Sequence, residues 1–183
     1  QKLYEQGFIT YMRTDSVNLS LESMLGAKKV IEEKFGKKYS LDNPRFFKNK
    51  SKGAQEAHEA IRPAYPEKDP EDLKKEVEND QYKLYKLIWE RMIASQMQPA
   101  VFDSVKVDIA AENKESKNNY LIQANGSTIK FDGFLNALSS RKTNGENFLP
   151  SLKVSDELEV DSISAEEKST TPPPRYSEAT LVK

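Results

Sequence analysis

The sequence of 183 residues contains no cysteine, a single histidine and no long apolar run. Without cysteine the chain can form neither disulfides nor thiolate metal sites, and a reducing compartment is expected. Because His58 is alone of its kind, a metal site built from several histidines is excluded. No stretch approaches the roughly 18 apolar residues that span a bilayer. These absences lead us to expect a cytoplasmic protein.

The net charge is also close to zero, because the sequence has 28 basic and 29 acidic residues. By itself this balance argues against a nucleic-acid partner. The distribution is uneven, however, since residues 28–52 hold nine Lys/Arg and only three Asp/Glu. Such a cluster can neutralise phosphates and release their counterions, but a solvated lysine-rich surface explains it equally well. The charge pattern therefore permits DNA binding without requiring it.

The first half of the chain shows helical periodicity. Ser20 is a suitable N-cap for a helix with apolar residues at helical spacing that stops at Gly36. A second helix is predicted from about Asp80, which could cap it, to Gln96. Residues 37–57 lack any period. We predict a long loop there, containing the basic cluster.

After Pro99 the apolar period changes to two, which is typical of half-buried strands. The pair Asn125-Gly126 predicts a hairpin turn between two such runs. Ser169–Pro174 holds three consecutive prolines and predicts an extended linker that leads into a new helix. The predicted strands are Val101–Ala111, Tyr120–Ala124, Thr128–Phe131, Phe134–Leu138 and Leu158–Ile163.

These patterns predict an α+β fold in which a helical domain is followed by a small antiparallel β domain. The predicted boundaries are residues 1–98 for the helical domain, 99–168 for the β domain and 169–183 for the linker and the start of a further domain. Gln1–Gln6 resembles the end of a helix and Ser177–Lys183 the beginning of one. We therefore expect the chain to be part of a longer protein.

One segment carries residue types suited to phosphoryl chemistry. Gly7–Ser16 favours an extended backbone, which would point Tyr11, Arg13 and Asp15 to one side. A phenol oxygen can attack phosphorus while a guanidinium holds the phosphate oxygens. Free tyrosine titrates at roughly pH 10, so an attacking phenol needs positive charge or a base nearby. From residue types alone, a packed strand tyrosine beside a surface Arg–Asp pair is the commoner interpretation.

A second segment, Ala54–Pro63, contains the lone histidine. His58 followed by Arg62 could bind a phosphate or steady a leaving oxygen. Because Pro63 biases Arg62 toward an extended backbone, any helical turn should end near Ile61. A lone histidine is more often structural, so this segment is also ambiguous alone.

Taken together, three segments resemble the type IA DNA topoisomerase family. They are Ile9–Ser16 (ITYMRTDS), Ala54–Pro63 (AQEAHEAIRP) and Pro172–Lys183 (PPPRYSEATLVK), which occur in the family's order and at roughly its spacing. The resemblance covers essentially the whole chain. Met12, and Glu59 with Arg62, are similar to the bacterial topoisomerase I subclass, whereas topoisomerase III usually has proline after the tyrosine. Topoisomerase III is the alternative subclass.

The resemblance implies a reaction on DNA. In this family a tyrosine attacks a phosphodiester in single-stranded or underwound DNA, giving a 5′-phosphotyrosine and a free 3′-hydroxyl. Another strand passes through the break, which is then resealed. Negative supercoils are relaxed without ATP, so the expected location is the nucleoid in the cytoplasm.

The resemblance also assigns roles to residues by motif position. Tyr11 would be the nucleophile, Arg13 would hold the scissile phosphate, and His58 would hydrogen-bond near that phosphate. Supporting positions around the tyrosine would be Thr10, Thr14, Asp15 and Ser16. Contacts to the DNA backbone, or to residues that touch it, would come from Arg62, Arg175 and Ser177, the last standing where threonine is often found.

The family's architecture implies what else the reaction needs. Residues 1–98 would belong to the tyrosine domain, 99–168 to one of two segments of the arch at the gate, and 169–183 would lead into the strand-binding domain. Mg²⁺ would be held by a Toprim domain, whose acidic cluster this sequence lacks. Asp15, Glu56 and Glu59 are too scattered to predict a metal site. We therefore expect no metal in this chain, and no activity without the remaining domains in cis.

Two other classes of function fit parts of the pattern. A non-catalytic DNA-binding module would explain the basic stretch and the order of helices and strands, but it needs neither the tyrosine–arginine pair nor the histidine segment. A phosphatase or nuclease fragment could use Tyr11 or His58, but it would usually need an acidic metal-binding cluster.

Overall fold

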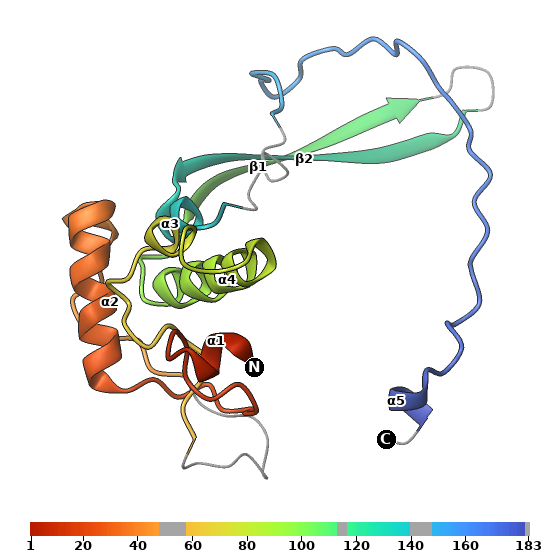
Figure 1. Cartoon of the computed structure of the whole chain (residues 1–183). Helices are drawn as coiled ribbons and strands as arrows, with labels where there is room; N and C mark the ends of the chain where they lie inside the picture. The colour runs from red at the N-terminus through yellow and green to blue at the C-terminus, as the bar shows by residue number, and fades with distance from the viewer. Residues whose placement is uncertain (48–57, 113–116, 140–147, 182–183) are drawn as a thin grey trace. The chain divides into compact units, whose positions relative to one another are not determined.

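The computed structural model describes residues 1–47, 58–112, 117–139 and 148–181, which form two units, Gln1–Leu149 and Pro150–Lys183. The first unit contains α1 (Lys2–Glu5), α2 (Leu21–Lys34), the 3₁₀ helix η1 (Lys37–Tyr39), α3 (Pro70–Leu73), α4 (Asn79–Ser95), β1 (Val101–Glu112), β2 (Asn119–Phe131) and the 3₁₀ helix η2 (Gly133–Ala137) (Figure 1). The second contains α5 (Glu178–Leu181). An α+β fold is confirmed.

The first predicted helix is present with its predicted cap. The side chain of Ser20 accepts a hydrogen bond from the Ser23 N–H at the start of α2. The helix ends at Lys34, with Phe35 as C-cap, and Gly36 follows at φ +97°. Glycine adopts this left-handed backbone at little cost, so the chain leaves the helix at the residue where the sequence predicts it.

The second predicted helix, α4, begins one residue earlier than its expected cap. Glu78 is the N-cap residue and makes no side-chain capping hydrogen bond. Asp80 lies inside the first turn, where it pairs with Lys83, so the prediction that Asp80 caps the helix is wrong. Burial of one face of α4 stabilises this helix without a side-chain cap.

The core of the first unit forms where α4 contacts α1, α2 and α3. Polar atoms of its aromatic side chains find backbone partners. The Trp89 indole N–H donates to the Pro66 carbonyl at 2.8 Å, and the Tyr85 hydroxyl donates to the Lys68 carbonyl at 2.8 Å. Burial raises the pKa of Tyr85 above its ordinary value. The fully buried side chains include Tyr85, Met24, Ile31, Leu73, Ile93, Met97 and Pro63.

The β region is one antiparallel hairpin, and its turn lies where the sequence did not predict it. β2 runs through Asn125-Gly126, which pair with Lys106 and Val105 of β1. The predicted turn at these two residues is therefore wrong, and the connection lies between Glu112 and Asn119. Twelve pairs of ladder partners set the register, and this cooperative pairing outweighs a local turn preference.

Two of the predicted strands are absent. Phe134–Leu138 forms η2 and its C-cap instead, because Gly133 at φ +50° turns the chain after β2. A Cβ on Gly133 would lie 2.5 Å from the Pro99 carbonyl oxygen, so only glycine fits this close approach. Leu158–Ile163 has no regular structure and is exposed, as is most of the second unit.

Tyr39, at the end of η1, ties the base of the hairpin to the helical part of the first unit. Its ring stacks on Phe131 with centroids 5.0 Å apart, and its hydroxyl donates to Asp132 Oδ1 at 2.8 Å. Asn136 donates to the same hydroxyl at 3.1 Å. In the predicted loop 37–57, η1 is the one regular element within the described residues, and 48–57 lie outside them.

Candidate active site

The tyrosine segment is an irregular loop rather than a strand. Its one ladder contact is an antiparallel bridge between Ile9 and Pro63. Exposure nevertheless alternates as an extended backbone predicts, because Tyr11, Arg13 and Asp15 are exposed. Met12 and Thr14, which lie between them, are partly buried, and Ser16, which follows Asp15, is buried. The three polar side chains thus reach solvent together.

The two ambiguous motifs meet at Tyr11. Its ring lies edge-on to the His58 ring with centroids 5.9 Å apart and an interplanar angle of 77°. Tyr4 of α1 also lies edge-on to Tyr11, with ring centroids 5.4 Å apart. The Tyr11 side chain still remains 41% exposed. It is therefore held by two aromatic neighbours but accessible to a ligand.

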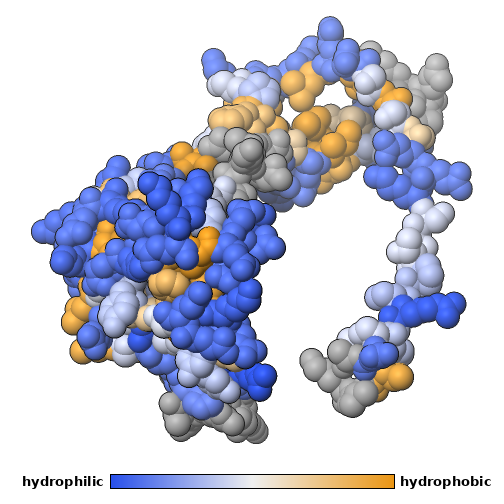
Figure 2. Space-filling view, in the orientation of Figure 1, coloured by the Kyte–Doolittle hydropathy of each residue, from blue (hydrophilic) through white to orange (hydrophobic). Residues whose placement is uncertain are grey.

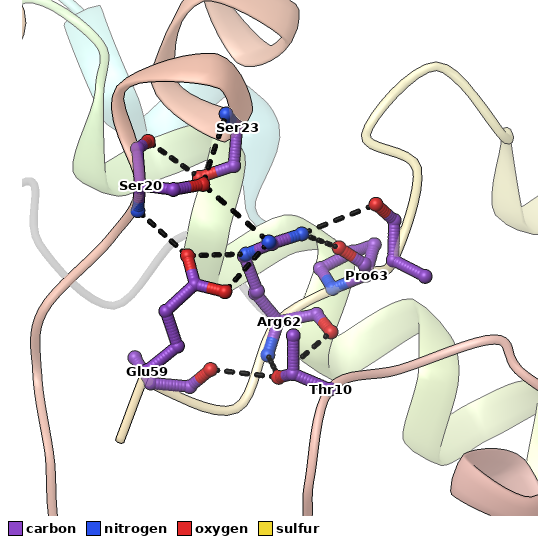
Figure 3. A network of polar contacts seen from close by, with 8 residues as sticks. Thr10, Ser20, Ser23, Glu59, Arg62 and Pro63 are labelled. Carbon is purple, nitrogen blue, oxygen red and sulfur yellow. Dashed lines mark hydrogen bonds and ion pairs between the residues drawn. The ribbon is translucent and has the colours of Figure 1, made fainter. Parts of the chain in front are cut away.

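Thr10, immediately before the tyrosine, joins the loop to the histidine segment (Figure 3). Its hydroxyl donates to the Ala60 carbonyl at 2.7 Å and accepts from the Arg62 N–H at 2.9 Å. The backbone N–H of Thr10 donates to the Arg62 carbonyl at 2.9 Å. Three hydrogen bonds thus fix the backbone on one side of Tyr11 to the segment that carries His58.

The guanidinium of Arg62 points into the protein, where carbonyls and a carboxylate surround it (Figure 3). Nε and Nη2 donate to the two Glu59 carboxylate oxygens at 3.1 and 2.7 Å. Nη1 donates to the carbonyls of Pro63 and Ala64 at 2.8 and 3.1 Å, and Nη2 also approaches the Ser20 hydroxyl at 3.5 Å. The Arg62 side chain is only 12% exposed.

Glu59 completes the network by accepting the Ser20 N–H at 2.6 Å. Partial burial raises the pKa of the Glu59 carboxyl. Hydrogen bonds from Arg62 and Ser20, together with the positive charge of Arg62, lower this pKa by more than burial raises it. Its pKa therefore lies below the ordinary value. Glu59 is a stable anion whose oxygens already have donors.

The remaining predicted residues differ in their surroundings. Thr14 and Ser16 shape the loop, because the Ser16 N–H donates to the Thr14 hydroxyl and the Asn18 N–H to the Ser16 hydroxyl. Arg13 makes no ion pair or hydrogen bond with any residue that the structure describes. Arg175 and Ser177 belong to the second unit, where Ser177 and Thr180 hydrogen-bond to each other at the start of α5.

Two residues of this region were not predicted as site residues. Glu59 stands three residues before Arg62, and this spacing is the signal that could have suggested an ion pair. Tyr4 carried no such signal, because its contact with Tyr11 depends on how α1 folds back onto the loop.

Two further findings concern the described residues alone. Among them, no three His, Asp or Glu side chains gather where a metal ion could be held. Nor does that part of the chain include a helix of the length and apolar character needed to cross a membrane.

Comparison with known proteins places this chain in a family. The sequence model of the family described as DNA topoisomerase matches residues 1–183. This match, together with similarity to named bacterial relatives, shows that the chain belongs to the bacterial type IA DNA topoisomerases, a class of isomerases. The family predicted from the three motifs is confirmed.

Similar proteins include DNA topoisomerase 1 of Rickettsia felis, 46% identical over 195 residues, and that of Rickettsia bellii, 47% identical over 195 residues. Both alignments cover 100% of this chain, but 25% and 24% of those relatives. Full-length topoisomerase I from Thermotoga maritima is a similar solved structure, with a TM-score of 0.61 and 30% identity over 79% of this chain and 21% of that one. The chain thus spans about a quarter of the length of these relatives.

Proposed function

We propose that this chain is the tyrosine-bearing part of a bacterial topoisomerase I that cleaves and reseals single-stranded DNA and so relaxes negative supercoils. The observation that carries the proposal is the contact between an exposed Tyr11 and His58, with the exposed Arg13 two residues further on. The exposure of Tyr11 leaves its ring accessible to a phosphodiester, and a guanidinium and an imidazole are the groups that would bind the phosphate.

The proposed reaction is a reversible transesterification. The Tyr11 oxygen forms a bond to the scissile phosphorus while the bond from phosphorus to the 3′ oxygen breaks. The phenol loses its proton and the departing 3′ oxygen gains one, so charge and atoms balance. After another strand has passed, the 3′-hydroxyl attacks the 5′-phosphotyrosine and restores both groups. No ATP is required, because each step exchanges one phosphodiester for another.

Arg13 and His58 would serve this step electrostatically. Arg13 has no partner among the described residues, and its guanidinium would hold the phosphate oxygens bidentately. His58 adjoins the Tyr11 ring and would hydrogen-bond near the phosphate. Thr10, Thr14 and Ser16 would maintain the loop, and Asp15 would stay at its exposed edge.

Other parts of a longer protein would supply the groups that this chain lacks. The Glu59 carboxylate does not fit a divalent cation, because Oε1 already accepts hydrogen bonds from Arg62 and Ser20, and Oε2 accepts one from Arg62. A Toprim domain in cis would therefore hold the Mg²⁺. In that protein, residues 1–98 would belong to the tyrosine domain, 99–168 to the arch and 169–183 to the approach to the strand-binding domain. This chain alone would not relax DNA.

The subclass also belongs to the proposal. The similar Rickettsia proteins are named DNA topoisomerase 1, and Met12 follows the tyrosine as in that subclass. Topoisomerase III remains the alternative. Acting on chromosomal DNA, the whole protein would work in the cytoplasm at the nucleoid.

The test is to trap the covalent intermediate in the full-length protein that contains this chain. With labelled single-stranded DNA, Tyr11→Phe should abolish the adduct while non-covalent binding persists. Tyr4→Phe is the matched control, because Tyr4 is a phenol beside Tyr11 and is 40% exposed. An adduct that survives Tyr11→Phe, or that is lost only in Tyr4→Phe, would show that the nucleophile is assigned wrongly.

A further inference from the structure

We propose that Glu59 and Arg62 form a positioning pair that holds the Tyr11 loop against His58, and that Arg62 does not bind DNA. This inference rests on the proposed function of Tyr11. It assigns Glu59 a role that its sequence position did not reveal. It also decides between the two roles predicted for Arg62, a contact to the DNA backbone and a support for residues that touch it.

The first observation is that the donors of Arg62 are already used. A guanidinium has five N–H groups, and here they face five acceptors: two carboxylate oxygens, two carbonyls and one hydroxyl. The carboxylate contact is bidentate, which is the strongest arrangement available to this side chain. A phosphate could bind Arg62 only by displacing these partners from a side chain that is 12% exposed.

The second observation is that the pair reaches both ends of one loop. At the beginning, the backbone of Arg62 and the carbonyl of Ala60 hold Thr10. At the end, the Glu59 carboxylate accepts the N–H of Ser20, the N-cap residue of α2. The Ala60 N–H also donates to the Asn18 carbonyl at 2.8 Å. Residues 10–20 are therefore closed by the segment 59–62.

The third observation is that the loop's two functional side chains do not hold themselves in place. Among the described residues, Arg13 has no polar partner, and Tyr11 makes ring contacts with Tyr4 and His58 but no hydrogen bond through its hydroxyl. Their positions therefore depend on the backbone of the loop, and that backbone depends on its two ends. Loosening either end would let Tyr11 move relative to a phosphate held near His58.

Energetics favour this function over simple stabilisation. A charged pair that is partly withdrawn from water gains much less stability than its distances suggest, because both groups lose hydration. Its directional hydrogen bonds, by contrast, specify one geometry for the loop. A displacement of the reacting oxygen by about 1 Å can slow a reaction about 100-fold.

The experiment uses the full-length protein with Glu59→Gln, Arg62→Gln and Arg62→Lys. The single-turnover rate of cleavage of a labelled single-stranded oligonucleotide is measured. The dissociation constant of the protein–oligonucleotide complex is measured at several salt concentrations. We expect cleavage to slow about 10- to 100-fold in all three variants. Affinity should change less than about twofold, and the dependence of affinity on salt should stay that of the wild type, because no phosphate contact is lost.

Arg62→Lys separates the two roles most sharply. A lysine keeps the positive charge but cannot make the bidentate contact with Glu59. If Arg62 positioned the loop, Arg62→Lys would cleave as slowly as Arg62→Gln. If Arg62 bound a phosphate, Arg62→Lys would retain much of the affinity, and Arg62→Gln would lower the salt slope by about one. The second pattern would overturn the proposal.

Thr10 provides a test that does not disturb the charged pair. Thr10→Val removes the hydroxyl at nearly constant volume and should slow cleavage, whereas Thr10→Ser keeps the hydroxyl and should restore it. Melting temperatures of all variants show whether they are folded, so slow cleavage in a folded protein is the supporting result. Wild-type cleavage rates in folded Glu59→Gln and Thr10→Val would overturn the inference.

Failure of this inference is distinguishable from failure of the proposed function. If Tyr11→Phe still forms the adduct, the nucleophile is wrong whatever Arg62 does. If Tyr11→Phe abolishes the adduct but Arg62→Gln cleaves normally, only the positioning role is wrong.

Discussion

Arg13 and Arg62 are both predicted from the sequence to act close to DNA, yet their surroundings in the structure are opposite. Arg13 lies on the exposed side of the loop with no partner among the described residues. Arg62 faces Glu59 and three backbone or hydroxyl oxygens nearby. A guanidinium satisfies its donors with phosphate, carboxylate or carbonyl oxygens alike. Which of these it meets depends on the acceptors that other segments bring near it.

The lowered pKa of Glu59 leads to a prediction at the residue scale. Because the folded-state pKa lies below the ordinary value of 4.5, the ionised carboxylate stabilises the fold above that value. This contribution is lost as the pH falls through the lower, folded-state pKa. The free energy of unfolding of the wild type should therefore fall more steeply below pH 4.5 than that of Glu59→Gln.

Urea denaturation at a series of pH values measures this difference. The comparison concerns the slope with pH rather than absolute stability, since the substitution also weakens the contact with Arg62. All other carboxyl groups are common to both proteins and act as an internal control. Parallel curves from neutral pH to acid would contradict the assignment of Glu59 as an anion stabilised by the fold.

At the scale of elements, the two long helices show different ways of starting. α2 begins with the serine that its sequence predicts, whereas α4 begins at Glu78 without a side-chain cap. Local capping signals are worth only about 1 kcal/mol, so the packing of a buried helix face can shift the start of a helix. The hairpin shows the same hierarchy, because twelve ladder pairs override the turn signal of Asn125-Gly126.

These starts predict opposite effects of two substitutions. Ser20→Ala should destabilise the first unit by about 1 kcal/mol, because the Ser23 N–H loses its acceptor. Glu78→Ser should stabilise it by roughly 0.5 kcal/mol, because a hydroxyl can cap α4. The exposed pair with Lys2 that this change removes contributes little.

Denaturant midpoints of the two variants and the wild type give the measurement. Ser20→Thr is the matched control for the first change, since it keeps a capping hydroxyl. A stability of Ser20→Ala equal to that of the wild type would show that α2 does not depend on its cap.

On the scale of the whole molecule, one apolar face of the hairpin is exposed over much of its length. Ladder partners share a face, which gathers the side chains of Val105, Val107, Ile109, Tyr120, Ile122 and Ala124. Val105 is 54% exposed and Ile122 is 52% exposed. Figure 2 shows hydrophobic side chains gathered along this hairpin. Exposed apolar surface of this kind favours association.

We therefore expect this chain, produced alone, to self-associate as its concentration rises. Ile122→Thr should weaken the association, because it removes an apolar side chain from the middle of that face while keeping β-branching. Leu121→Thr is the matched control, since Leu121 is adjacent and exposed but points to the opposite face. Sedimentation velocity over a range of concentrations provides the measurement. Equal effects of the two substitutions would argue against association through the apolar face.

The amino-acid sequence by itself determined the family, the α+β class and the helix that starts after Ser20. It also determined that exposure alternates along the tyrosine segment, with Tyr11, Arg13 and Asp15 exposed. These depend on residue identity, on short spacings and on backbone preferences that act within a few residues. Only the tertiary structure decided that Tyr11 meets His58 and Tyr4, that Arg62 turns inward to Glu59, and that Asn125-Gly126 continues a strand. Such contacts join segments far apart in the chain, and their free energy comes from partners that no local pattern contains.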